Sequence, residues 1–83
     1  MEVFIAVLED RHIGYDFEVF RKEHDAMVQI GKWQKVEEDK WAHDGCVDWE
    51  IDKYPDHKSG LWYMVDSKND DGPTMTLWKK EVQ

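Results

Sequence analysis

The sequence predicts an α+β fold in which a single antiparallel β-sheet of about five strands carries one amphipathic helix on one face. Three observations predict this class. Short segments that alternate apolar and polar residues lie on both sides of one segment with a helical period, and turn residues separate them. The predicted order is β-β-α-β-β-β. Most strands follow one another at hairpin spacing, which favours antiparallel pairing and leaves a lone helix to cover one face.

The chain has 83 residues, the length of a single domain, and we expect one unit over residues 1–83. A domain of this size buries only about 60% of the surface that its unfolded chain exposes. Its one cysteine, Cys46, cannot form a disulfide within the chain, so the fold must depend on apolar burial. Five tryptophans contribute to that burial, each able to bury about 150–250 Å². An unpaired thiol also fits a reducing compartment, and we expect a cytoplasmic protein.

Residues 3–9 and 15–20 are predicted to form the first hairpin, with turn residues between them. In the first strand, apolar side chains point to both faces: Phe4, Ala6 and Leu8 to one, and Val3, Ile5 and Val7 to the other. This pattern is typical of a central strand that is covered on both sides. Because one helix covers one face, the second face must be shielded by aromatic side chains such as Trp62 or Trp78, by a second copy, or by a partner.

Residues 23–40 are predicted to form the helix. Its apolar and polar residues recur at helical spacing on opposite sides: Ala26, Met27, Ile30 and Trp33 against Gln29, Lys32, Lys35 and Glu38. Gly31 costs up to about 1 kcal/mol relative to alanine inside a helix. Either the helix packs closely against a strand at Gly31 or the predicted boundary is wrong.

The remaining three strands are predicted over residues 46–54, 61–66 and 74–82. Pro55 and the residues up to Gly60 break the chain after the first of them, and residues 69–73 form a turn before the last. No repeat or linker divides the chain.

The net charge of −8 limits the classes of partner. It repels nucleic acid and anionic membranes, so we expect neither direct nucleic-acid binding nor membrane association. The longest apolar run, Val3 to Leu8, is too short to span a bilayer and follows Glu2 instead of a basic cluster. A basic protein is the partner that this charge attracts.

Carboxylates are concentrated in one third of the chain. Every second residue of one predicted strand is acidic, which places neighbouring carboxylates about 6.6 Å apart: Asp48, Glu50 and Asp52. Four more lie just before this strand: Glu37, Glu38, Asp39 and Asp44. DNA is itself a regular row of negative charges. Two interpretations stay open: a mimic that occupies a basic nucleic-acid groove, or a solvated strand face that keeps the protein soluble.

The tip of the first hairpin holds Asp10, Arg11 and His12. Loop residues are often placed to contact a partner, and an arginine there could hold a carboxylate or a phosphate. The alternative is a turn that Asp10 stabilises through an internal pair with Arg11.

Neither a metal site nor an active site is expected. His43 and Cys46 form at most one closely spaced pair, whereas structural zinc takes four ligands, usually in two such pairs. The acidic turn at residues 66–72 lacks the glycine position and closing glutamate of a calcium loop. Cys46 with His43 as its base would be a weak nucleophile, because the neighbouring Asp44 and Asp48 would raise the thiol pKa. We expect no cofactor and no enzymatic activity.

A resemblance covers most of the chain. The run Val7-Leu8-Glu9-Asp10-Arg11-His12, the helix, the strand starting Gly60-Leu61-Trp62-Tyr63 and the strand within residues 72–81 resemble small uncharacterised microbial β-β-α-β-β-β proteins. Size, acidity and lack of motifs are similar, as a class, to phage-encoded inhibitors of bacterial defence, including the anti-CRISPR proteins; this likeness transfers no site.

Together these features predict a non-enzymatic protein-binding module, an inhibitor from a phage or mobile element that blocks a basic nucleic-acid-binding surface of its target. Two alternatives remain: a small-ligand-binding or enzymatic domain built on the Asp10-Arg11-His12 loop, and a structural homodimer.

Overall fold

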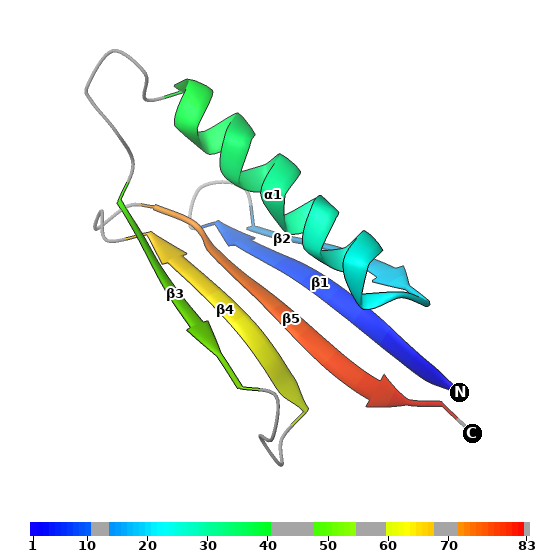
Figure 1. Ribbon diagram of the computed structural model, residues 1–83. Helices are drawn as coiled ribbons and strands as arrows, with labels where there is room; N and C mark the ends of the chain where they lie inside the picture. Colours follow the sequence, from blue (N-terminus) through cyan, green and yellow to red (C-terminus); the bar gives the residue numbers. More distant parts are fainter. Residues whose placement is uncertain (11–13, 41–47, 55–59, 68–71, 83) are drawn as a thin grey trace.

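The computed structural model describes residues 1–10, 14–40, 48–54, 60–67 and 72–82. Its elements follow the predicted order: β1 (Glu2–Asp10), β2 (Gly14–Phe20), α1 (Glu23–Lys40), β3 (Trp49–Lys53), β4 (Leu61–Ser67) and β5 (Thr74–Glu81). One antiparallel sheet carries the helix on one face, which confirms the predicted α+β class (Figure 1). Residues 46 and 47, predicted to begin the third strand, lie outside the described ranges.

The strand order in the sheet is β2-β1-β5-β4-β3, and every neighbouring pair is antiparallel. The first and last strands of the chain are therefore neighbours, with Ala6 opposite Leu77. β1 lies inside the sheet, as its two apolar faces predict. β2 and β3 form the two edges.

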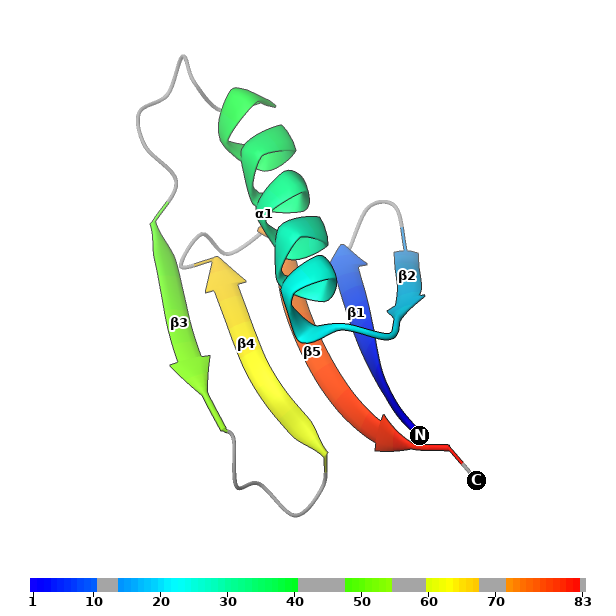
Figure 2. The same cartoon turned by 45° about the vertical axis from the view of Figure 1, so that its right-hand side comes forward.

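The helix packs over one half of the sheet. It contacts β1, β2 and β5, and Figure 2 shows β3 and β4 lying beyond its side. Acidic residues in its first turn and Lys40 in its last turn complement the helix dipole.

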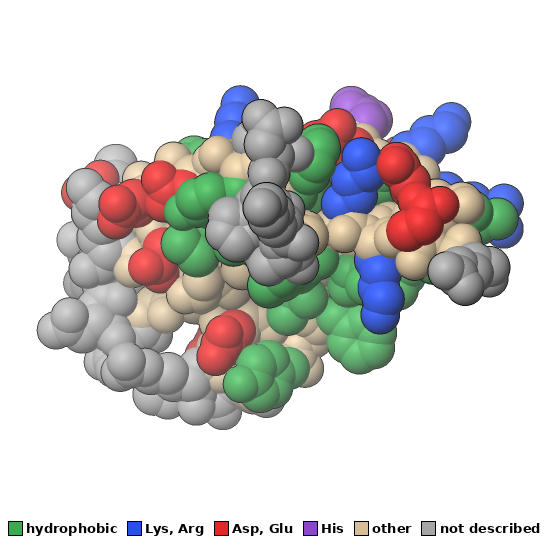
Figure 3. Space-filling view, turned by 90° about the horizontal axis from the view of Figure 1, so that it is seen from below, with side chains coloured by type: hydrophobic (Ala, Val, Ile, Leu, Met, Phe, Trp, Pro, Cys, Tyr) green, Lys and Arg blue, Asp and Glu red, His purple; other side chains and the backbone are tan. Residues whose placement is uncertain are grey.

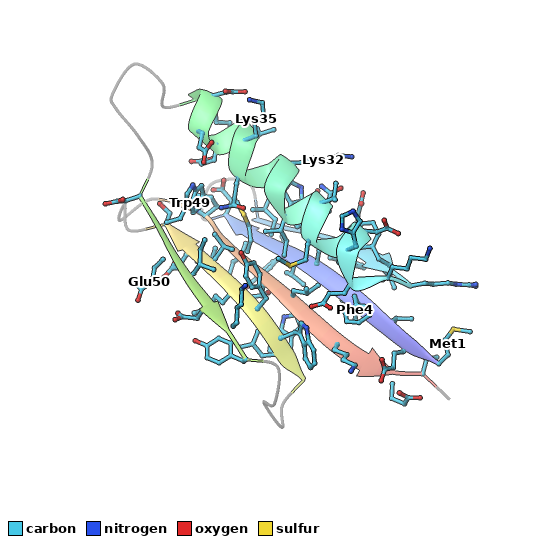
Figure 4. All side chains as sticks on the ribbon, in the orientation of Figure 1. Met1, Phe4, Lys32, Lys35, Trp49 and Glu50 are labelled. Carbon is cyan, nitrogen blue, oxygen red and sulfur yellow. The ribbon has the colours of Figure 1, made fainter. Side chains whose placement is uncertain are left out.

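The core lies between the helix and the three central strands. Its members are the buried side chains on one face of β1, β4 and β5 and two from the helix: Phe4, Ala6, Tyr63, Val65, Met75 and Leu77 with Ala26 and Ile30. They meet because side chains alternate between the faces of a strand, and cross-strand partners such as Tyr63 and Leu77 share a face. Figure 4 shows Phe4 between the sheet and the start of the helix.

Gly31 fits neither explanation offered for it. The helix continues through this position with the predicted bounds, residues 23–40, and Gly31 is exposed. A Cβ atom built on Gly31 would meet no atom within 4 Å, so no strand packs closely there. The glycine therefore carries its full conformational cost without a packing reason.

A bulge in β4 turns Trp62 towards the helix. Leu61 pairs with Trp78 and Tyr63 with Leu77, so Trp62 is the extra residue between two consecutive partners. The Trp62 indole Nε1 donates to Glu23 Oε1 in the first helical turn at 2.6 Å. The Lys79 ammonium lies 4.5 Å from the Trp62 ring centroid, a cation–π contact. Trp62 therefore does not shield the second face of the sheet, in contrast to the expectation from sequence.

Tyr63 predicts an alkaline limit to stability. Burial raises the pKa of the Tyr63 phenol, so the folded state holds this proton more tightly than the unfolded chain, where a tyrosine ionises near pH 10. This contribution is complete below about pH 10 and is lost as the pH rises above it. Urea unfolding of wild type and Tyr63→Phe at about pH 9 and 11 should show the larger loss of unfolding free energy in wild type. Equal losses would show that this phenol contributes nothing.

Candidate protein-binding surface

The face of the sheet opposite the helix, called here the open face, is largely apolar. Its members follow from the register, since residues directly opposite one another share a face: Val19 pairs with Ile5, and Ile5 with Trp78. The apolar residues of the open face are Val3, Ile5, Val7, Tyr15, Phe17, Val19, Leu61, Met64 and Trp78. No described helix or strand packs on this face.

Three of these side chains are strongly exposed. Tyr15, Phe17 and Val19 of β2 show 76%, 63% and 55% of their surface. Single exposed apolar residues are ordinary, but these lie in register with the half-buried Val7 and Ile5 and form one continuous patch. Figure 3, which views the molecule from below, shows hydrophobic side chains reaching the surface beside charged ones. The second face of the sheet is thus not shielded within the described part of the chain.

The indole of Trp78 is fixed on the open face. Its Nε1 donates to the Thr76 hydroxyl at 2.9 Å, and Thr76 lies two residues away on the same side of β5. Because the polar atom is already bonded, the ring presents its apolar surface to whatever covers the face. Trp78 therefore lies where the sequence predicted a shielding or binding residue.

A row of carboxylates crosses one end of the open face. Following the register from one edge to the other, Glu50 lies opposite Asp66, Asp66 opposite Thr74, Thr74 opposite Glu9, and Glu9 opposite Tyr15. We call Glu9, Glu50 and Asp66 the acidic row. Asp66 accepts a hydrogen bond from the Thr74 hydroxyl at 2.9 Å, and Glu9 from the Tyr15 hydroxyl at 3.4 Å. Among the described residues, no cation forms an ion pair with any of the three.

The sequence predicted a row of carboxylates along β3, and the sheet adds carboxylates of β4 and β1 beside it. Glu50 and Asp52 share a face of β3, and Asp48 is exposed just before the strand. Figure 4 shows Glu50 projecting outward from β3. Asp66 and Glu9 were not singled out by sequence reasoning, because only the pairing of β3, β4, β5 and β1 places them beside Glu50.

The Tyr54 phenol lies beside carboxylates at this edge. The pKa of its phenol is raised, first by partial burial and then by the charge of Asp52, which also accepts a hydrogen bond from it. Glu50 adds to the same effect from farther away. A negative charge nearby disfavours ionisation of the phenol, so the shift has the sign expected beside clustered carboxylates.

The other predicted acidic residues lie on the helix, across the sheet from the open face. Glu37 is buried and lies 4.0 Å from the Lys40 ammonium. Glu38 accepts a hydrogen bond from the Trp49 indole at 3.0 Å, joining the end of the helix to β3. Asp39 is exposed. The tertiary structure thus divides the predicted acidic set between two sides of the molecule.

The hairpin-tip hypothesis falls largely outside the described residues. Asp10 is the last residue of β1, is half-buried and pairs with Gly14. Arg11, His12, Asp44, His43 and Cys46 all lie outside the described ranges.

A small pocket on the helix side is lined by Glu23, Met27, Lys53, Trp62 and Tyr63. Its volume of about 200 Å³ is below the 300–1,000 Å³ typical of ligand sites. The Glu23 carboxylate that lines it already accepts the Trp62 hydrogen bond. We therefore regard the open face, and not this pocket, as the stronger candidate for a binding site.

The described residues contain no group of three His, Cys, Asp or Glu side chains placed to hold a metal ion. Within the same ranges no helix is long and apolar enough to cross a membrane. No protein-family model, no curated protein and no solved structure matches this chain.

Proposed function

We propose that this protein is a non-enzymatic binding module that covers a basic surface of another protein with its open face. The observation that carries this proposal is the continuous apolar patch bordered by the acidic row. Protein interfaces commonly combine an apolar, aromatic centre with a polar rim. Trp78, Phe17 and Tyr15 supply aromatic residues of the kind enriched at binding hot spots.

Charge indicates the chemistry of the partner. The net charge of −8 steers the protein towards positive surfaces, and the acidic row places carboxylates that no described cation neutralises beside the apolar patch. Nucleic-acid-binding proteins carry basic surfaces that are suited to a row of negative charges. A protein that occupied such a surface would compete with nucleic acid for it.

Competition with nucleic acid would make this protein an inhibitor of its target. Occupying the nucleic-acid groove of a defence protein would make this chain an inhibitor, as the class likeness to phage-encoded inhibitors suggests. We therefore propose a cytoplasmic target that is a basic, nucleic-acid-binding protein.

The test compares two variants of equal charge. Glu9→Lys with Glu50→Lys reverses two members of the acidic row, and Asp25→Lys with Asp39→Lys reverses two exposed carboxylates on the helix. Tagged proteins are used for affinity capture from bacterial lysate, followed by mass spectrometry. We expect wild type and the helix variant to retain one basic nucleic-acid-binding protein, displaced by DNA and by salt, and the row variant to lose it.

Two results would contradict the proposal. If both variants lose the captured protein equally, binding depends only on net charge. If the row variant still retains it, the acidic row is not part of the binding surface. Melting temperatures of both variants show whether a loss reflects unfolding instead. A monodisperse dimer that captures nothing would favour the homodimer alternative.

A further inference from the structure

β2 is an edge strand whose outer side pairs with no strand among the described residues. It forms seven consecutive one-to-one pairs with β1, from Gly14 to Phe20, and no strand lies on its other side within the described residues. All of its residues except Phe20 are exposed. Proline, lysine and bulges commonly block an edge, and β2 has none of them; its charged residues are the acidic Asp16 and Glu18.

The outward backbone groups of β2 belong to its apolar residues. In an antiparallel strand, alternate residues direct both N–H and C=O to the same side. The Phe17 N–H donates to the side-chain Oδ1 of Asp16 at 2.9 Å and not to β1, so this donor lies on the outer side of the strand. Tyr15 and Val19 lie two residues before and after Phe17, so their backbone N–H and C=O groups also point outward. An added strand would pair with these outward groups, and at Phe17 its carbonyl would replace the bond that the N–H now makes to Asp16.

The side chains of β2 determine which strand would fit. Tyr15, Phe17 and Val19 point to the open face, and Asp16 and Glu18 to the other. Glu18 is also held by the helix: with the Gln29 amide oriented to satisfy both of its ends, Gln29 donates to Glu18 Oε2 at 3.1 Å.

A second copy of β2 would fit badly. Antiparallel pairing centred on Phe17 places Asp16 of one copy opposite Glu18 of the other. Shifting by two residues places Asp16 opposite Asp16, or Glu18 opposite Glu18. Like charges directly opposite are destabilising, whereas opposite charges at these positions stabilise the pair.

We propose that β2 accepts an extended segment of the basic partner as a sixth, antiparallel strand. Lysine or arginine of that segment would lie opposite Asp16 and Glu18, and its apolar residues beside Tyr15, Phe17 and Val19, widening the open face. This inference rests on the proposed function, because it names the part of the partner that docks.

The test uses a nine-residue peptide with blocked ends in which lysine alternates with valine. Residues opposite Phe17 direct their N–H towards β2, so N-methylation of the valines removes the bonds of the added strand. N-methylation of the lysines changes only the outer edge and is the matched control. We expect the valine-methylated peptide to bind about tenfold or more weakly, and the lysine-methylated one to bind like the parent, by fluorescence anisotropy.

A charge swap adds an independent readout. Asp16→Lys with Glu18→Lys should transfer binding from the lysine peptide to one in which glutamate alternates with valine. Asp25→Lys with Asp39→Lys, which makes the same net change on the helix, should leave the preference for lysine. Circular dichroism of both variants checks that the fold is retained.

Equal binding of both N-methylated peptides would overturn strand addition and indicate attraction by charge alone. If no peptide binds while affinity capture succeeds as described above, strand addition is wrong and the open-face proposal stands. If the peptide pattern is as expected but the row variant still captures its partner, the β2 edge is supported and docking through the acidic row is overturned.

Discussion

Replacing Leu77 by alanine is expected to destabilise the protein by about 2–5 kcal/mol. Leu77 lies on the middle strand, β5, and is fully buried. Its cross-strand partners are Ala6 on one side and Tyr63 on the other, so truncation leaves a cavity between rigid strands that cannot easily close. Small domains have roughly 5–15 kcal/mol of total stability, so one such change removes a large part of it. Urea unfolding followed by tryptophan fluorescence and far-UV circular dichroism measures the loss.

The matched control is Val36→Ala. Val36 lies in the same domain on the solvent side of α1, with 56% of its surface exposed. Surface substitutions of this kind usually change stability by less than about 0.5 kcal/mol. A similar loss in both variants would mean that the core does not lie between the helix and the central strands. The slope of free energy against urea concentration should be the same in both.

Alanine at two glycines should act in opposite directions. Gly60 has a φ of +89°, which L-residues rarely adopt, and a Cβ atom there would lie 2.9 Å from the Lys79 carbonyl oxygen. Its own carbonyl accepts a hydrogen bond from the Lys79 N–H at 2.8 Å, so the two strands cannot separate without losing a bond. We expect Gly60→Ala to cost about 1–3 kcal/mol.

Gly31→Ala should instead stabilise the protein by about 0.5–1 kcal/mol, because alanine restricts the unfolded chain and meets no atom in the folded one. Thermal unfolding of both variants gives the comparison. A loss at Gly31 would reveal an unseen contact on the helix, and a gain at Gly60 would show that neither the φ angle nor the Lys79 carbonyl restricts that site.

Local patterns predicted the elements well. The helix over residues 23–40 was predicted with its observed bounds, and apart from the start of β3 every observed strand end lies within one residue of the predicted one. Of the candidate surface, the pattern predicted the two apolar faces of β1 and the shared face of Glu50 and Asp52. It could not predict that β2 is an exposed edge, since strand order depends on contacts between distant segments.

By itself, the sequence determined which residues share a face in the strands without a bulge and how far the helix runs, because side-chain periodicity is fixed by local backbone geometry. Only the tertiary structure decided that Asp66 and Glu9 lie in register with Glu50, that the bulge turns Trp62 away from the open face, and that Gly60 contacts Lys79. Register and bulges are set by pairing between segments far apart in the chain, where a shift of one residue exchanges the two faces of a strand.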